Sequence, residues 1–167
     1  HVDMDTPIER LRQICEKHGI EWQENWGAGK LVFELYDELG EATLVNPTFV
    51  CDYPEEVSPL SKRKDDDPRL TDRFELVICG HEYANAFSEL NDPVDQAGRF
   101  AEQVAAKGFG DDEAMGYDYD YVRALEYGMP PAGGIGYGID RMIMLFCDAP
   151  AIRDVLLFPQ MKPEVIT

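Results

Sequence analysis

Apolar positions along the chain follow two patterns, one with the spacing of helices and one with the spacing of strands. Apolar residues three and four positions apart, as at Ile8, Leu11, Ile14 and Cys15, predict a first helix that ends at Gly19. Further helices are predicted over 30–41, 93–107, 121–127 and 139–146. Strand-like runs cover 48–53, 72–78, 82–90 and 133–138. Strands in a block with helices around them predict an α+β fold, a mainly antiparallel sheet flanked by helices, in a single domain over 1–167.

Local signals set the ends and the inward faces of these helices. Thr6 and Glu9 have the spacing of a capping box, with Pro7 at the first helical position. In the helix predicted over 30–41, the spacing predicts an inward face of Leu31, Val32, Leu35 and Leu39. In the helix predicted over 93–107, it predicts an inward face of Val94, Ala97, Ala101 and Val104.

Residues 133–141 are Gly-Gly-Ile-Gly-Tyr-Gly-Ile-Asp-Arg, and an apolar helix pattern follows at once. Backbone with so many glycines can approach a ligand or a neighbouring strand very closely. Arg141 falls in the first turn of the helix, and a planar, permanently charged guanidinium suits phosphate or a flat ring. The pattern alone is equally compatible with a tightly packed strand–helix corner that carries a surface arginine.

Composition and charge narrow the range of functions. A formal net charge of −18 argues against a nucleic-acid surface on this segment, because phosphate backbones require clusters of Lys and Arg. Four widely spaced cysteines and few histidines exclude a credible zinc constellation and suit reduced thiols in the cytoplasm. No apolar run approaches membrane-spanning length. The segment 27–30 fails as a phosphate loop because Leu31 replaces the required Ser or Thr.

Polar residues at strand spacing form one candidate pocket. Asn85, Phe87 and Glu89 lie two positions apart, so they project from the same face of an extended strand. Glu89 could accept from an ammonium, Phe87 could flank methylene groups, and Asn85 could donate to a carboxylate. An amphipathic strand with one solvated face is the alternative for so short a stretch.

Carboxylates form a second candidate site. Glu75 and Glu82 could share Mg²⁺, which takes one or two carboxylates and completes its shell with water and phosphate. Their convergence requires a chain reversal near Gly80, and Glu82 requires a bulge to join the face of Asn85. The acidic segment 111–120 could also bind a cation, although a solvated loop explains it more simply.

Taken together, these residues resemble the class II lysyl-tRNA synthetases. Phe74-Glu75 with residues 80–92, Gly-His-Glu-Tyr-Ala-Asn-Ala-Phe-Ser-Glu-Leu-Asn-Asp, resembles the lysine-pocket region of that family. Residues 133–141 resemble the third signature motif of class II synthetases. Shorter stretches at 47–54, 58–60 and 156–160 agree, and the likeness extends from about 26 to 163.

The resemblance implies a function and a role for each candidate residue. The family activates lysine with ATP to lysyl-adenylate and transfers it to tRNA, using Mg²⁺, in the cytoplasm and as a homodimer. The implied substrate-binding residues are Glu89 for the ε-ammonium, Phe87 for the aliphatic chain and Asn85 for the carboxylate. The implied ATP-site residues are Glu75 and Glu82 for Mg²⁺, Gly136 and Gly138 for the nucleotide, and Arg141 as the catalytic arginine.

The first and second motifs of the family and its N-terminal anticodon-binding barrel have no counterpart in these 167 residues. The chain therefore resembles the C-terminal part of a catalytic domain, and we expect it to be inactive alone. Two other functions remain open at this stage. One is a synthetase-like paralogue that attaches lysine to a protein, and the other is a non-catalytic binding or scaffolding module.

Overall fold

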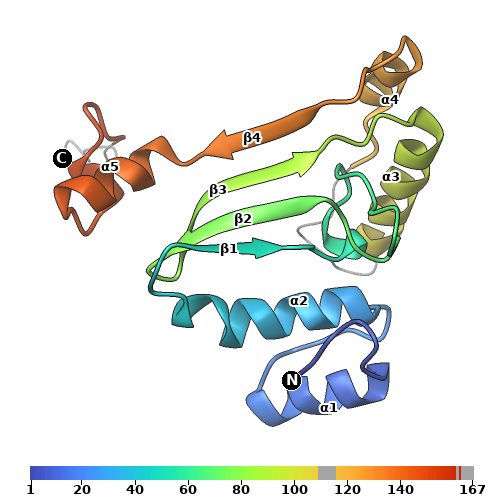
Figure 1. The fold of residues 1–167 in the computed structure, drawn as a ribbon, viewed down its shortest axis with the longest axis horizontal. Coiled ribbons are helices and arrows are strands. Elements are labelled where there is room, and N and C mark those ends of the chain that lie inside the picture. The colour runs from blue at the N-terminus through green and yellow to red at the C-terminus, as the bar shows by residue number, and fades with distance from the viewer. Residues whose placement is uncertain (109–115, 161, 163–167) are drawn as a thin grey trace, which may run out of the picture.

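A four-stranded antiparallel sheet is the centre of the structure, a computed structural model that describes residues 1–108, 116–160 and 162 (Figure 1). The strands lie in sequence order, each paired with the next. They are β1 (Thr48–Cys51), β2 (Arg73–Ile78), β3 (His81–Ser88) and β4 (Gly133–Tyr137). This arrangement with its flanking helices confirms the predicted α+β class.

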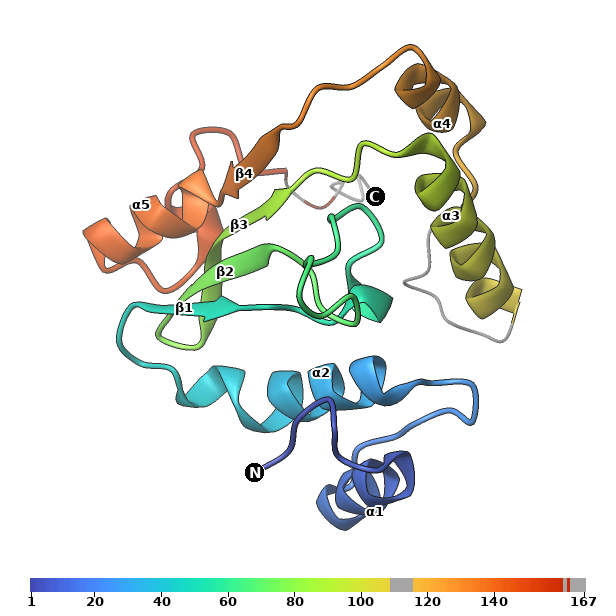
Figure 2. The same cartoon turned by 45° about the vertical axis from the view of Figure 1, so that its right-hand side comes forward.

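The described residues form five α-helices, which lie beside the sheet and at its two ends. They are α1 (Ile8–His18), α2 (Ala28–Leu39), α3 (Pro93–Gly108), α4 (Tyr119–Glu126) and α5 (Ile139–Cys147). Short 3₁₀ turns are η1 (Glu41–Thr43), η2 (Glu55–Val57) and η3 (Ile152–Asp154). The helices α1 and α2 lie along the β1 side, α3 and α4 lie at one end of the sheet, and α5 lies at the other end (Figures 1 and 2).

The two N-terminal helices share a core of their own, built from Leu11, Cys15, Leu31 and Leu35. As predicted, α1 ends at Gly19, which takes the left-handed conformation (φ 75°) that glycine adopts without strain. The predicted capping box is wrong. Pro7 has extended backbone, so the helix begins at Ile8, and the Thr6 hydroxyl turns back to hydrogen-bond Asp3.

Two predicted inward faces need correction. In α2 the helix ends at Leu39, which is 42% exposed rather than buried. In α3 the apolar stripe faces outward, with Val94 80% exposed, and the buried residues are Gln96, Arg99 and Phe100. The reason is that α3 packs against a loop whose carbonyl groups need donors, and Gln96 and Arg99 supply them.

A tight hairpin joins β2 to β3. Cys79 and Gly80 both have positive φ (53° and 71°), the geometry of a two-residue turn that matches strand twist. The pairing runs Leu76 with Ala84 and then Val77 with Glu82, so β3 contains a bulge. The reversal and the bulge that the carboxylate pair requires are therefore both present.

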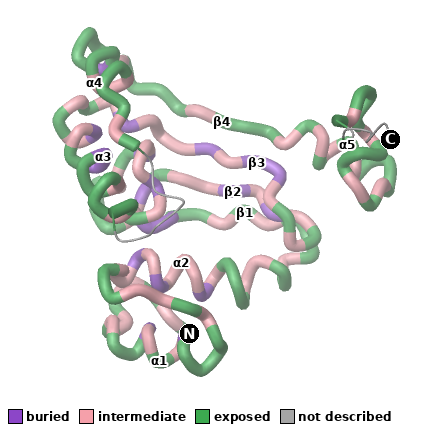
Figure 3. Tube along the Cα trace, turned by 180° about the vertical axis from the view of Figure 1, so that it is seen from behind, coloured by how far each residue is buried: buried purple, intermediate pink, exposed green. Residues whose placement is uncertain are grey.

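Burial differs strongly between the two ends of the sheet (Figure 3). Buried side chains concentrate in α2, in β2 and β3, and where α3 packs. The helix α5 forms as predicted but contains no buried residue, with Ile139 and Phe146 well exposed. In the acidic segment 111–120, positions 111–115 lie outside the described residues, and Asp118 caps α4 through the Tyr121 N–H.

Candidate functional site

One face of the sheet collects most of the predicted site residues. Directly paired residues share a face, and the register pairs Glu75 with Asn85 and Asn85 with Gly136. Phe87 pairs with Gly134 in the same way. The bulge turns Glu82 to this same face, since Glu82 pairs with Val77, two residues beyond Glu75. We call this surface of β2, β3 and β4 the polar face.

Glu89 continues the polar face just beyond the end of β3. Its backbone N–H donates to the Ala132 carbonyl, and its carboxylate lies directly over Gly134. A Cβ atom built on Gly134 would sit 2.1 Å from Glu89 Oε1, so a side chain at this position would force the end of the Glu89 side chain to move. Partial burial raises the pKa of Glu89. Glu89, Phe87 and Asn85 thus lie along one line, as strand spacing predicts.

Glu75 is nearly buried (9% exposed) and is held at both carboxylate oxygens. Oε2 accepts from the Tyr53 hydroxyl at 2.8 Å, and Oε1 accepts from Arg73 Nη2. Burial and the hydrogen bond to Glu75 raise the pKa of Tyr53, which therefore remains a donor at neutral pH.

Glu82 lies in an environment with surplus negative charge. Burial raises the pKa of its carboxyl, and Glu75 raises it further, while Arg141 and Arg73 act in the opposite direction. Burial also raises the pKa of Glu41 in η1, and the negative charges of Glu75 and Glu82 raise the same pKa further. Three carboxylates therefore repel one another at this edge of the polar face, and a bound cation would relieve that repulsion.

Arg141 reaches the same edge from the first turn of α5. Its Nη1 donates to the backbone carbonyl of Glu82 at 2.5 Å. Gly138 precedes the helix and donates its N–H to the Tyr83 carbonyl at 2.9 Å, which fixes α5 to β3. The guanidinium is exposed and stands beside Glu82, where an anionic ligand could meet it.

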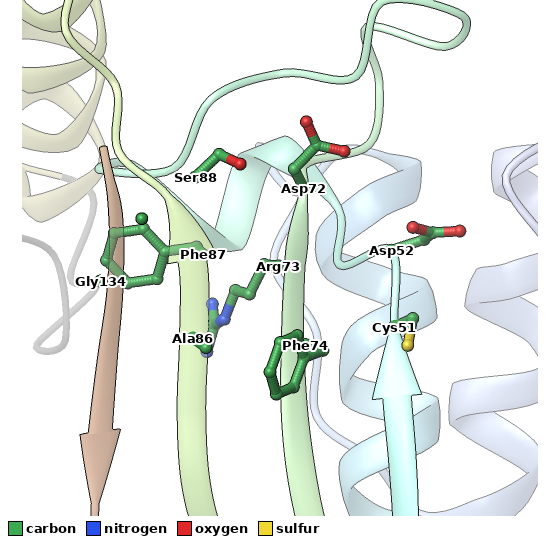
Figure 4. A pocket seen from close by; sticks show the side chains of 10 residues that line it. Cys51, Asp52, Asp72, Arg73, Phe74, Ala86, Phe87, Ser88 and Gly134 are labelled. Atoms are coloured by element: carbon green, nitrogen blue, oxygen red, sulfur yellow. The ribbon is translucent and has the colours of Figure 1, made fainter. Parts of the chain in front are cut away.

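A cavity of about 450 Å³ lies beside the predicted pocket rather than in it. Phe74 pairs with Cys51 on one side and with Ala86 on the other, and these three residues line the cavity from the face opposite the polar face. Asp52 and Asp72 stand at its rim, at the ends of β1 and β2 (Figure 4). Phe87 and Gly134 border it from β3 and β4.

Sequence reasoning missed three residues that build the polar face. Arg73 and Tyr53 hold Glu75, and Gly134 makes room for Glu89. Strand spacing could have found two of them, because Arg73 is two positions from Glu75 and Gly134 is two positions from Gly136. Tyr53 follows β1 after a kink at Asp52 (φ 62°), so no periodicity points to it.

Sequence similarity places the chain in a known family. The family model of class II tRNA synthetases (D, K and N) matches residues 2–162, and the chain belongs to this family. Among its relatives, the lysine–tRNA ligase of Teredinibacter turnerae is 57% identical over 97% of the chain. That of Vesicomyosocius okutanii is 59% identical over 96%, and the heat-inducible lysine–tRNA ligase of Escherichia coli K12 is 56% identical over 97%. The chain spans about a third (32%) of the length of each of these relatives.

Proposed function

We propose that this chain forms the lysine pocket and one side of the ATP site of a lysine–tRNA ligase. The observation that carries the proposal is the Glu89 carboxylate, seated over Gly134 in line with Phe87 and Asn85. A partly buried carboxylate at the end of an aromatic wall complements an alkyl chain that ends in an ammonium. The names of the relatives support the same substrate pair, lysine and tRNA.

Each pocket residue has a distinct task in this proposal. Glu89 accepts from the ε-ammonium of lysine, and Phe87 packs against its methylene groups. Asn85 Oδ1 already accepts from Arg73, so its Nδ2 presents two donors for the lysine carboxylate. A neutral or acidic substrate side chain would leave Glu89 unpaired or repelled, which disfavours it.

The ATP side of the proposed site is built from β4 and the start of α5. Gly136 and Gly138 leave that part of the polar face without side chains, so a flat nucleotide can lie close to the backbone. Arg141, whose guanidinium stands at this edge beside Glu82, then contacts the nucleotide and its terminal phosphate.

The carboxylates suit Mg²⁺ held together with phosphate. Oxygen donors match this hard cation, and each oxygen of Glu75 keeps a lone pair beside its present hydrogen bond. Within residues 1–108, 116–160 and 162, no group of three or more His, Cys, Asp or Glu could hold a metal by itself. Glu75 and Glu82 would therefore bind Mg²⁺ with ATP rather than in a protein cage.

Catalysis in this proposal is positioning and charge neutralisation. A lysine carboxylate oxygen attacks the α-phosphorus of ATP, the bond to the bridging oxygen breaks, and pyrophosphate leaves. Mg²⁺, when bound, neutralises charge on the phosphates. Asn85 orients the attacking carboxylate, and Arg141 offsets negative charge on the departing phosphates. No side-chain nucleophile takes part.

The remaining partners and the location rest on the resemblance to the family. We propose transfer of lysine to tRNA through regions outside this chain, a homodimer as the working form, and a cytoplasmic location. None of the helices in the described residues is long and apolar enough to cross a membrane.

Lysine-dependent exchange of pyrophosphate into ATP tests the proposal, in a chain extended at its N-terminus to the length of the relatives. Glu89→Gln should lower kcat/KM for lysine roughly ten- to hundredfold, because a charged hydrogen bond is lost. Glu126→Gln, on the exposed side of α4, should leave it unchanged.

Absence of lysine-dependent exchange in the extended chain would contradict the proposal. Exchange that is followed by no transfer of lysine to tRNA would favour ligation of lysine to a protein instead. The 167 residues alone should show neither exchange nor transfer.

A further inference from the structure

Arg73, the first residue of β2, makes contacts that go well beyond an ion pair. Its Nη1 donates to the Val57 carbonyl at 2.9 Å and to Ser58 Oγ at 3.0 Å, both in the loop around η2. Its guanidinium carbon lies 4.4 Å from the centre of the Tyr53 ring. The side chain is mostly buried (15% exposed). It is thus held in one geometry from three directions.

The remaining donors of Arg73 point to two residues of the proposed site. Nε donates to Asn85 Oδ1 at 3.2 Å, and Nη2 donates to Glu75 Oε1. Asn85 is the proposed lysine-carboxylate ligand, and Glu75 is a proposed magnesium ligand. The rigid, forked guanidinium group of Arg73 therefore connects the lysine side of the site to the ATP side.

The hydrogen bond to Asn85 decides which end of the amide faces the substrate. With Oδ1 fixed toward Arg73, Nδ2 lies on the opposite side of the amide and donates to a carboxylate. Without that donor the amide can rotate by half a turn and present its oxygen, which repels a carboxylate.

We propose that Arg73 is a positioning residue that orients the Asn85 amide for the substrate carboxylate while it holds Glu75 for the metal–phosphate group. This inference rests on the proposed function. It requires arginine, since a lysine ammonium is a single point with three donors and cannot serve Asn85, Glu75 and the loop carbonyl at fixed angles.

A pair of ligands tests this role in the extended chain. Lysine has the carboxylate that Asn85 meets, and cadaverine, its decarboxylated analogue, keeps both the alkyl chain and the ammonium for Glu89. Arg73→Lys should weaken lysine binding roughly tenfold or more, as measured by calorimetry, because a charged hydrogen bond is lost. It should change cadaverine binding less than twofold. Arg69→Lys, at an exposed arginine, is the matched control.

A double-mutant cycle identifies the partner through which Arg73 acts. In an Asn85→Ala background, Arg73→Lys should change the lysine-to-cadaverine affinity ratio no further. The proposal would be overturned if Arg73→Lys lowered this affinity ratio by the same factor in the Asn85→Ala background as in the wild type. It would also be overturned if Arg73→Lys weakened the binding of lysine and cadaverine equally. Should Arg73→Lys fail to fold, Ser58→Ala removes one anchor of the fork, and an unchanged ratio in that variant would overturn it too.

The two proposals can fail separately. If the extended wild-type chain binds neither lysine nor cadaverine, the proposed function fails, and the role of Arg73 fails with it. If it binds lysine more tightly than cadaverine and Arg73→Lys preserves that ratio, only the positioning role fails.

Discussion

The alternate glycines of β4 are glycine for different physical reasons. At Gly134 a side chain would collide with Glu89, at 2.1 Å from its Oε1. At Gly136 the nearest atom to a Cβ is the Asn85 carbonyl oxygen at 3.9 Å, an ordinary contact. Neither residue has a positive φ, so backbone strain explains neither. A side chain at Gly134 would displace the Glu89 carboxylate, whereas Gly136 leaves space for something outside the protein.

Gly136→Ala should therefore leave the thermal midpoint of unfolding within about 2 °C, because the structure has room for the methyl group. The KM for ATP should rise about tenfold or more, since the nucleotide can no longer approach the backbone. Steady-state exchange kinetics and thermal unfolding of the extended chain measure both effects. Ile135→Ala, on the opposite face, controls for a change in β4 itself.

Gly134→Ala should behave differently, raising the KM for lysine because Glu89 must move. If Gly134→Ala and Gly136→Ala changed the KM for lysine and the KM for ATP in the same way, the separate tasks assigned to these glycines would be wrong.

At the scale of elements, the helix α3 positions the pocket through a buried ionic network. Arg99 is 3% exposed and donates to the carbonyls of Ser58 and Ser61 at 3.2 and 2.6 Å. It also pairs with Asp95 and Glu55. Ser61 in turn forms a β-bridge with Glu89, so this network supports the backbone that carries the lysine ligand.

Arg99→Leu should destabilise the protein by about 1–3 kcal/mol, because it leaves the carbonyls of Ser58 and Ser61 without their buried donor, while Asp95 and Glu55 keep Arg63 as a partner. Chemical denaturation of the extended chain measures the free energy of unfolding. Arg69→Leu, which removes an exposed arginine paired with Asp67, should change that free energy little. Equal changes in the free energy of unfolding for the two variants would show that burial of Arg99 contributes nothing to stability.

At the scale of the whole molecule, a high negative charge coexists with a large exposed apolar surface. The formal net charge is −18 at pH 7. Exposed apolar side chains follow the outer face of β4 and continue through α5 to the C-terminal segment, including Ile135, Phe146, Leu157 and Phe158. Charge repulsion keeps copies of the chain apart, while the apolar surface favours contact.

The isolated 167-residue chain should therefore associate more strongly as salt is added, since salt screens repulsion and leaves the hydrophobic effect intact. Sedimentation velocity at 0.02 M and 0.5 M salt, at equal protein concentration, measures the change. Phe146→Ser should reduce association at high salt. Val94→Ser, at an exposed position on α3 outside this apolar surface, should not, and association that falls with added salt would contradict this account.

The local pattern of the sequence determined the elements and which of the candidate residues of β3 share the polar face. Helix and strand periods are local properties, so α1 to α5 and the alignment of Asn85, Phe87 and Glu89 could be predicted, while the reversal near Gly80 followed only as a condition for Glu75 and Glu82 to converge. The strand parity of Glu82 relative to Asn85 also showed that the two could share a face only if the strand contained a bulge, which it does.

Only the tertiary structure decided what each residue meets across the fold. Spacing marked the apolar stripe of α3 as its inner face, but the loop beneath it presents carbonyls, and these select Gln96 and Arg99. The fork of Arg73 between Asn85 and Glu75 likewise depends on strand register, and the place of Glu89 depends on β4 arriving opposite it from far along the chain. Periodicity identifies which side chains share a face, whereas burial and hydrogen bonding depend on the partner that the fold brings to that face.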